Sequence, residues 1–179
     1  MKIYAVRHGL TESNKKGVLN MSSDEPLIEE GIKKIEELRD ALPGDIKMIY
    51  SSPLMRARQT AKILNQRIQL PIVYHDELKE VDWGTLRGKS FGEIENEYGP
   101  EYGKDQYAHL EFDFQPFEGE SVEQVRARVH RIVDQVKHSH KEGPILLVAH
   151  GGVLRILEHD YNQKFISNMP NGLIVEIEV

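Results

Sequence analysis

Residues 144–155 read PILLVAHGGVLR, and this stretch decides the fold class. Its five consecutive apolar residues at 145–149 predict a strand that is covered on both faces of a sheet. A helical pattern, GGVLRILEHDYN at 151–162, follows with only His150 between them. A fully covered strand that leads directly into a helix is typical of α/β proteins with a mostly parallel sheet.

Further strands are predicted at 2–6, 47–51, 71–74 and 173–179. The last of these, LIVEIEV, alternates apolar and charged residues, which indicates a half-exposed strand at the edge of the sheet. An exposed edge of this kind would also allow pairing between subunits, so a homodimer stays open.

Helical patterns separate the strands. LIEEGIKKIEELRDAL at 27–42 has one apolar stripe, with Gly31 as a minor defect in it. A second helix is predicted to start with Ser52 as its N-cap and Pro53 at its first position. A third starts at Ser121, with Gln124 in capping-box register. Together these elements predict a three-layer α/β/α sandwich formed by residues 1–179 as one domain.

The region 75–120 is the least regular part of the chain. It is rich in glycine, aromatic and acidic residues, and it contains one short helical pattern near 90–98. Long irregular connections inside a compact domain are often functional. We therefore expect this region to determine substrate specificity.

Composition excludes several classes of function. The 179 residues include no cysteine, which rules out disulfides, thiol nucleophiles and cysteine-ligated metals. A formal net charge of −6 argues against a general nucleic-acid binder. The sequence has neither a signal-peptide core nor an apolar run long enough to cross a membrane, so a cytoplasmic protein is expected.

Charged and imidazole side chains follow three of the predicted strands. Residues 7–9 (RHG), 51–61 (SSPLMRARQTA) and 150–152 (HGG) all begin where a strand ends. In open α/β sheets, ligands bind beyond the carboxyl ends of the strands. A single histidine or arginine at such a place is usually structural. Two histidines and one or more arginines that meet at one rim suit a phosphate group.

Five stretches resemble the histidine phosphatase superfamily, which includes the cofactor-dependent phosphoglycerate mutases. They are RHGLTESN, SSPLMRARQTA, LKEVDWGTLRGKS, FEGESVEQVRARV and LLVAHGGVLR, in the family's order and spread over residues 2 to about 156. The match is to a small phosphatase branch of this phosphoglycerate mutase-like family. It implies a three-layer α/β fold and a covalent phosphohistidine intermediate.

The resemblance also assigns roles to residues. It makes His8 the nucleophile and Glu80 the proton donor, and it uses Arg7, Arg56 and His150 to hold the phosphoryl group. The secondary contacts that it implies come from the side chains of Thr11 and Asn14, the backbone N–H of Gly151, and Asn20 and Met21 at the entrance to the pocket.

Elementary chemistry agrees with these roles. Attack on phosphorus requires a neutral imidazole, and arginine cations nearby should lower the pKa of His8 from its usual value of about 6.5. Guanidinium groups match phosphate oxygens and supply fixed positive charge, so neither a metal nor a cofactor is expected. Spacing alone does not distinguish the proton donor, because four carboxylates crowd one loop: Asp76, Glu77, Glu80 and Asp82.

The sequence departs from the family pattern at the pocket. Leu10 stands where glutamate or glutamine is common, and Asn20-Met21 replaces a frequent Gln-Gly pair. We expect Met21 to narrow the pocket and to make it more apolar. The remaining candidate cations and histidines are interpreted as surface groups: Arg58, Arg87, Lys89, His138 and His140.

The favoured function is a phosphatase for a small organic phosphomonoester. A phosphoglycerate mutase is the closest alternative, but the chain is short and 78–90 lacks the Glu-Arg-His-Tyr-Gly element typical of mutases. A non-catalytic phosphate-binding module is the second alternative, and it would not require Glu80. The sequence does not identify the phosphorylated metabolite.

Overall fold

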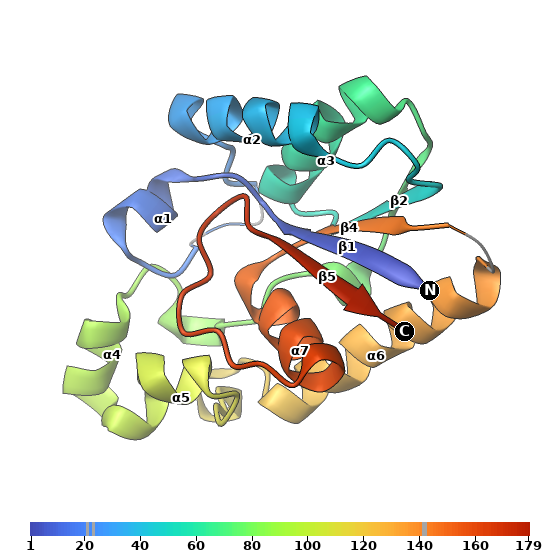
Figure 1. The fold of residues 1–179 in the computed structure, drawn as a ribbon. Coiled ribbons are helices and arrows are strands. Elements are labelled where there is room, and N and C mark those ends of the chain that lie inside the picture. The colour runs from blue at the N-terminus through green and yellow to red at the C-terminus, as the bar shows by residue number, and fades with distance from the viewer. Residues whose placement is uncertain (21, 23, 141–142) are drawn as a thin grey trace.

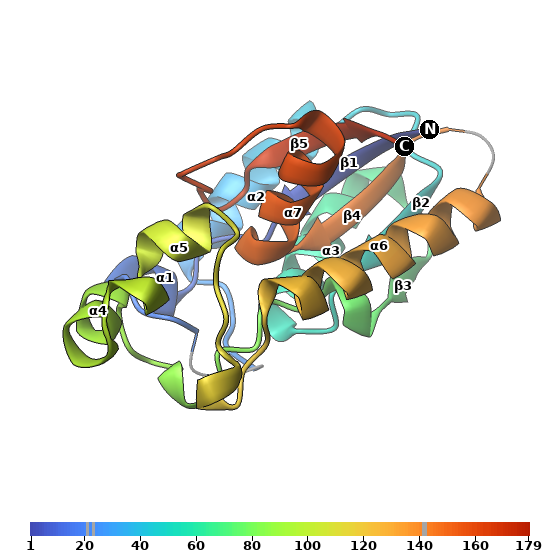
Figure 2. The same ribbon diagram turned by 90° about the horizontal axis from the view of Figure 1, so that it is seen from below.

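The computed structural model describes residues 1–179 except 21, 23 and 141–142. One sheet runs through it in the order β3-β2-β4-β1-β5 (Figures 1 and 2). Pairing is parallel from β3 to β1, and β5 joins the edge antiparallel to β1. This confirms the mostly parallel sheet and the predicted edge strand. The strands are β1 (Lys2–Arg7), β2 (Met48–Ser51), β3 (Ile72–Tyr74), β4 (Ile145–Ala149) and β5 (Ile174–Glu178).

Helices cover both faces of the sheet. α2 (Glu29–Ala41) and α3 (Met55–Ile68) lie on one face, and α6 (Val122–Ser139) and α7 (Gly151–Asn162) lie on the other (Figures 1 and 2). Alternate side chains of β4 enter two separate cores, one for each helical layer. The predicted three-layer arrangement is confirmed. No helix among the described residues is long and apolar enough to span a membrane.

The irregular region forms a wall beyond the carboxyl ends of the parallel strands, beside α1 (Glu12–Lys16) (Figure 2). It contains the expected helix α4 (Phe91–Tyr98) and also α5 (Lys104–Ala108), which is too short to show a helical period in the sequence. Trp83 holds the wall together, because its ring packs at 5.0 Å from Tyr107 and 5.2 Å from Phe114 between ring centroids. Four short 3-10 turns complete it: Asp76–Leu78, Gly84–Leu86, Pro100–Tyr102 and Gln115–Phe117.

The structure confirms one of the predicted helix starts and corrects another. The capping box of α6 is confirmed, since Ser121 and Gln124 bond reciprocally. The predicted start of α3 is wrong: the helix begins at Met55, with Leu54 as its N-cap. The Ser52 hydroxyl accepts a hydrogen bond from the Leu54 N–H at 3.3 Å and lies 2.8 Å from a ring nitrogen of His150. This contact across the sheet holds Ser52 outside the helix.

The glycine in α2 has a structural reason. A Cβ on Gly31 would lie 2.4 Å from the carbonyl oxygen of Leu10, and one on Gly9 would lie 2.9 Å from a side-chain carbon of Ile35. The backbone after His8 therefore rests directly on the surface of α2. Gly31 is a site of close approach, and its low helix propensity is the cost of that contact.

We expect Gly31→Ala to lower the free energy of unfolding by about 1–3 kcal/mol, because the added methyl group collides with backbone that cannot rotate away. Gly92→Ala in α4 is the matched control, since its Cβ would meet nothing within 4 Å. The control should be neutral or stabilising by up to about 1 kcal/mol. Urea denaturation measures both, and equal stability of the two variants would contradict the close contact.

Candidate active site

The register of β1 and β4 brings the two predicted histidines together. Arg7 lies opposite Ala149 in this parallel pair, and the His8 N–H donates to the Ala149 carbonyl at 3.0 Å. His8 and His150 follow these paired residues, and their ring centroids are 5.0 Å apart. The predicted meeting of strand ends at one rim is confirmed.

His8 has the form that a nucleophile requires. Its Nδ1 lies 2.7 Å from the Gly9 carbonyl oxygen, which can only accept, so Nδ1 carries the proton. Nε2 then holds a free lone pair, and it is buried without a hydrogen-bond partner. Burial, followed by the charges of Arg56 and Arg7, holds the pKa of His8 well below its usual value. The predicted effect of the arginines is confirmed, although burial contributes more.

His150 is the N-cap of α7 and is also fully buried. Its Nε2 lies 2.8 Å from the Ser52 hydroxyl, and its Nδ1 has no partner. Burial is again the main reason that its pKa is well below the usual value, with Arg56 and His8 adding to the effect. A protonated His150 therefore needs an anion beside it.

The two arginines beside His8 also have unpartnered nitrogen atoms. Arg7 donates from one terminal nitrogen to the Met169 carbonyl, and Arg56 donates to the Ser22 carbonyl at 3.3 Å. The Nε atoms of both arginines are buried without a partner. Among the described residues, five buried side-chain nitrogens lack a partner, and four of them belong to Arg7, His8, Arg56 and His150. Buried polar atoms are normally satisfied, so this cluster points to an anionic ligand.

Glu80 is the carboxylate that lies at this cluster. Its Oε1 accepts hydrogen bonds from the Gly152 N–H at 3.1 Å, in the first turn of α7, and from the Val81 N–H at 3.0 Å. The other three candidates are paired elsewhere, and this distinguishes Glu80 from them. Asp76 pairs with Lys79 at 3.1 Å, Glu77 with His75 at 2.5 Å, and Asp82 with Arg87 at 2.5 Å.

The predicted secondary contacts are partly engaged with one another. The hydroxyl of Thr11 accepts hydrogen bonds from the Asn20 side chain at 3.2 Å and from the Asn14 N–H at 3.4 Å. Asn20 also donates to Glu25 at 2.6 Å. Asn14 lines a cavity next to Arg7, together with Gly151. The side chains of Thr11 and Asn20 are therefore held in place by the hydrogen bond between them.

Two other departures from the family pattern, Met21 and Leu10, have different outcomes. Met21 lies outside the described residues, so its predicted effect on the pocket stays a prediction. Leu10 contributes backbone atoms to the contact with α2, and its carbonyl accepts a hydrogen bond from the Ile28 N–H at 3.0 Å. His138 is exposed as expected, whereas the half-buried His140 is hydrogen-bonded to Tyr50 at 2.8 Å.

Asn171 was missed by sequence reasoning. Its buried amide group donates to the carbonyls of His8 at 3.0 Å and Gly9 at 3.2 Å, and to the Asn14 side chain at 2.9 Å. It therefore fixes the backbone that carries the His8 ring. In the sequence, Asn171 precedes Gly172 and a strand, which indicates only a turn.

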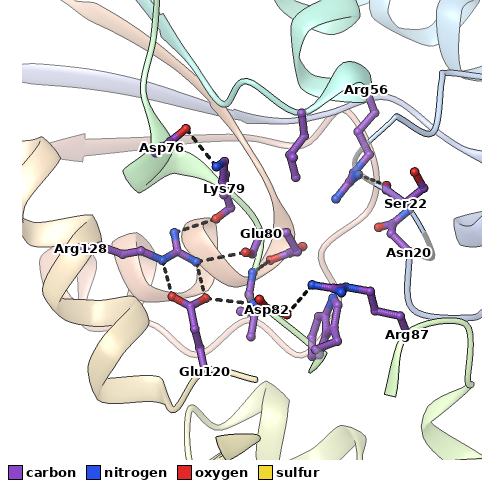
Figure 3. A pocket seen from close by; sticks show the side chains of 13 residues that line it. Asn20, Ser22, Arg56, Asp76, Lys79, Glu80, Asp82, Arg87, Glu120 and Arg128 are labelled. Carbon is purple, nitrogen blue, oxygen red and sulfur yellow. Dashed lines mark hydrogen bonds and ion pairs between the residues drawn. The ribbon is translucent and has the colours of Figure 1, made fainter. Parts of the chain in front are cut away.

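Two cavities meet at Glu80 and Trp83, which line both. The one beside Arg56 has a volume of about 550 Å³ (Figure 3), and the one beside Arg7 has about 490 Å³. Three of the four carboxylates in the first cavity are paired with a cation from the same wall. Among the described residues that line it, Arg56 and Glu80 are the two charged groups outside these three pairs.

The fold and the site together describe an α/β protein with buried histidine and arginine side chains at the sheet rim, a set of groups suited to an anion. Comparison with known proteins is more specific: the chain matches the histidine phosphatase superfamily (branch 1) over residues 3–175, and it belongs to that family. This confirms the resemblance found in the sequence motifs.

Individual relatives carry phosphatase names. A probable phosphatase, C1687.21, from Schizosaccharomyces pombe is 30% identical over 168 residues, 92% of this chain and 75% of that protein. A putative phosphoserine phosphatase 2 from Hydrogenobacter thermophilus is 32% identical, covering 87% and 76%. The crystal structure of TTHB049 from Thermus thermophilus matches with a TM-score of 0.81 and 30% identity over 99% of this chain and 94% of that one. Other relatives are named probable phosphoglycerate mutases.

The burial of His8 predicts a specific dependence of stability on pH. The native state keeps His8 neutral, whereas the unfolded chain takes up a proton below about pH 6.5, so acid favours unfolding. Between pH 7 and 5, the free energy of unfolding should fall more steeply for the wild type than for His8→Asn. The difference in slope should approach about 1.4 kcal/mol per pH unit. Urea titrations in phosphate-free buffer measure it, and parallel curves would contradict the assignment.

Proposed function

We propose that this protein hydrolyses small organic phosphomonoesters through a phosphohistidine formed on His8, with Glu80 as general acid and then general base. The observation that carries the proposal is the state of His8: it is buried and neutral, its Nε2 lone pair is free, and arginine charges surround it. Family membership and the phosphatase names of relatives support the same reaction class.

In the first step, His8 Nε2 attacks phosphorus and the bond from phosphorus to the ester oxygen breaks. Arg7, Arg56 and His150 neutralise the charge of the phosphoryl oxygens. Glu80, acting as the general acid, gives a proton to the departing oxygen, so the alcohol leaves neutral. The dianion beside the site favours the charged form of His150, which becomes an additional donor.

In the second step, water attacks the phosphorus of the phosphohistidine and the bond to Nε2 breaks. Glu80, now ionised, takes the proton from the water and is ready for the next cycle. Inorganic phosphate leaves and His8 returns to its neutral form. The covalent intermediate divides one difficult hydrolysis into two easier transfers.

The charge balance of the larger cavity favours a hydrolase over a mutase. A phosphoglycerate mutase must hold a substrate carboxylate as well as the phosphoryl group. Here Lys79, Arg87 and Arg128 are already paired with carboxylates in the cavity wall. The site is proposed to work within residues 1–179 as a single domain, and its alcohol leaving group lies against the 75–120 wall.

Replacement of the nucleophile tests the central role. His8→Ala should reduce turnover of p-nitrophenyl phosphate by at least about 10³-fold, because no covalent intermediate can form. His138→Ala is the matched control, since this exposed side chain lies at the far end of α6. Comparable turnover by wild type and His8→Ala would overturn the nucleophile assignment, whereas no turnover above background by either protein would favour the non-catalytic alternative.

Glu80→Gln tests the acid independently. It should lower turnover of an alkyl phosphate by about 10²–10⁴-fold while the Kd for inorganic phosphate stays within a few-fold, because the amide cannot transfer the proton. Asp76→Asn in the same loop is the control. An undiminished rate in Glu80→Gln would move the acid to a neighbouring carboxylate.

The mutase alternative has its own test. Isomerisation of phosphoglycerate in the presence of a bisphosphoglycerate primer should be slower than hydrolysis of simple monoesters. Isomerisation well above hydrolysis would replace the proposed reaction with a mutase reaction on the same phosphohistidine core.

A further inference from the structure

Arg128 holds the backbone on which Glu80 is mounted. This α6 side chain is 8% exposed, and one terminal nitrogen donates to the carbonyls of Glu77 and Lys79, each at 2.7 Å. The other donates to the carbonyl of Glu80 itself at 3.1 Å (Figure 3). Three carbonyls of one short segment thus converge on a single guanidinium group.

Glu120 completes the contact from the other side. Its two carboxylate oxygens accept hydrogen bonds from Nε and a terminal nitrogen of Arg128, both at 2.9 Å, so the ion pair is bidentate. One of these oxygens also accepts the Asp82 N–H at 2.9 Å, and the Glu120 N–H donates to the Asp82 carbonyl at 2.9 Å. The Arg128–Glu120 pair therefore holds the chain on both sides of Glu80.

The local structure of Glu80 makes such support necessary. Residues 79–83 belong to neither a helix nor a strand, so no regular hydrogen-bond ladder fixes them. A proton donor must lie within about 3 Å of the oxygen that it protonates, and small displacements are costly. α6 supplies a rigid support, because it is 18 residues long and its start is fixed by a capping box.

We propose that Arg128 and Glu120 are positioning residues for the acid–base function of Glu80. The inference rests on the proposed function, because it presumes that Glu80 transfers protons. Among the described residues, no hydrogen bond or ion pair joins Arg128 or Glu120 to His8. We assign their contribution to the backbone contacts at 77–82, and Arg128→Lys retains the charge by which Arg128 helps to lower the pKa of His150. Their loss should therefore impair proton donation while leaving phosphoryl transfer to His8 nearly intact.

The test is the dependence of the rate on the leaving group. p-Nitrophenolate departs readily without a proton, whereas the alkoxide of β-glycerophosphate does not. kcat/KM reports the steps up to the first phosphoryl transfer, so it isolates the role of the acid. Arg128→Lys keeps the charge but cannot span three carbonyls and a carboxylate. It should lose about 10²-fold in kcat/KM for β-glycerophosphate and less than about threefold for p-nitrophenyl phosphate.

Two further variants keep the result interpretable. Arg126→Lys is the matched control on the same helix, since Arg126 pairs with Asp160, and it should leave both substrates unaffected. Glu120→Gln removes only the negative charge that pairs with Arg128. Like Arg128→Lys, it should lower kcat/KM more for β-glycerophosphate than for p-nitrophenyl phosphate, but by a smaller factor. The thermal unfolding temperature of each variant shows whether it is folded under the conditions of the kinetic assays.

Glu80→Gln should show the same leaving-group preference, and adding Arg128→Lys to it should cause little further loss. Equal losses for both substrates in Arg128→Lys and in Glu120→Gln would mean a merely structural role and would overturn this inference alone. Absence of the preference in Glu80→Gln would instead overturn the acid assignment in the proposed function, and with it this inference.

Discussion

The parallel pairing of β1 with β4 is the constraint on which the site depends. β4 is fully buried and its side chains alternate between two cores, so a shift of one residue would send each of its apolar side chains to the wrong face of the sheet. The same register places Arg7 opposite Ala149, which leaves His8 and His150 side by side at the rim. Core packing, and not a local motif, therefore sets the distance between the two histidines.

The fold also buries guanidinium and imidazole groups of which several nitrogen atoms have no hydrogen-bond acceptor among the described residues, although Glu80 lies beside them. Burial and the two arginines keep the histidines neutral, and four nitrogen atoms lack partners. In the proposed reaction, a phosphate dianion would satisfy these atoms and would favour the protonated form of His150. The burial that suits His8 to the proposed nucleophilic role thus also suits the site to an anion.

Much of this was predictable from the sequence where the signal is local. Their position at strand ends identifies Arg7, His8 and His150 as candidate site residues, and the periodicity of apolar residues predicts the helices that cover the sheet. The relations that were missed are those that only tertiary structure creates. Ser52 resembles an N-cap until its contact with His150 is known. Asn171 resembles a turn residue although it holds the backbone of the nucleophile. Gly31 resembles a defect because the segment that rests on it is distant in the sequence.

The proposed nucleophile and the proposed acid are positioned by different physical means. His8 directly follows β1, so the sheet fixes it and its place tolerates little change. Glu80 stands in an irregular segment, and it lines both cavities. A loop of the kind expected to determine specificity can vary only if its proposed catalytic group is held separately. The bidentate ion pair between Arg128 and Glu120 meets this requirement, because it grips backbone atoms that any side-chain sequence at 77–82 would still present.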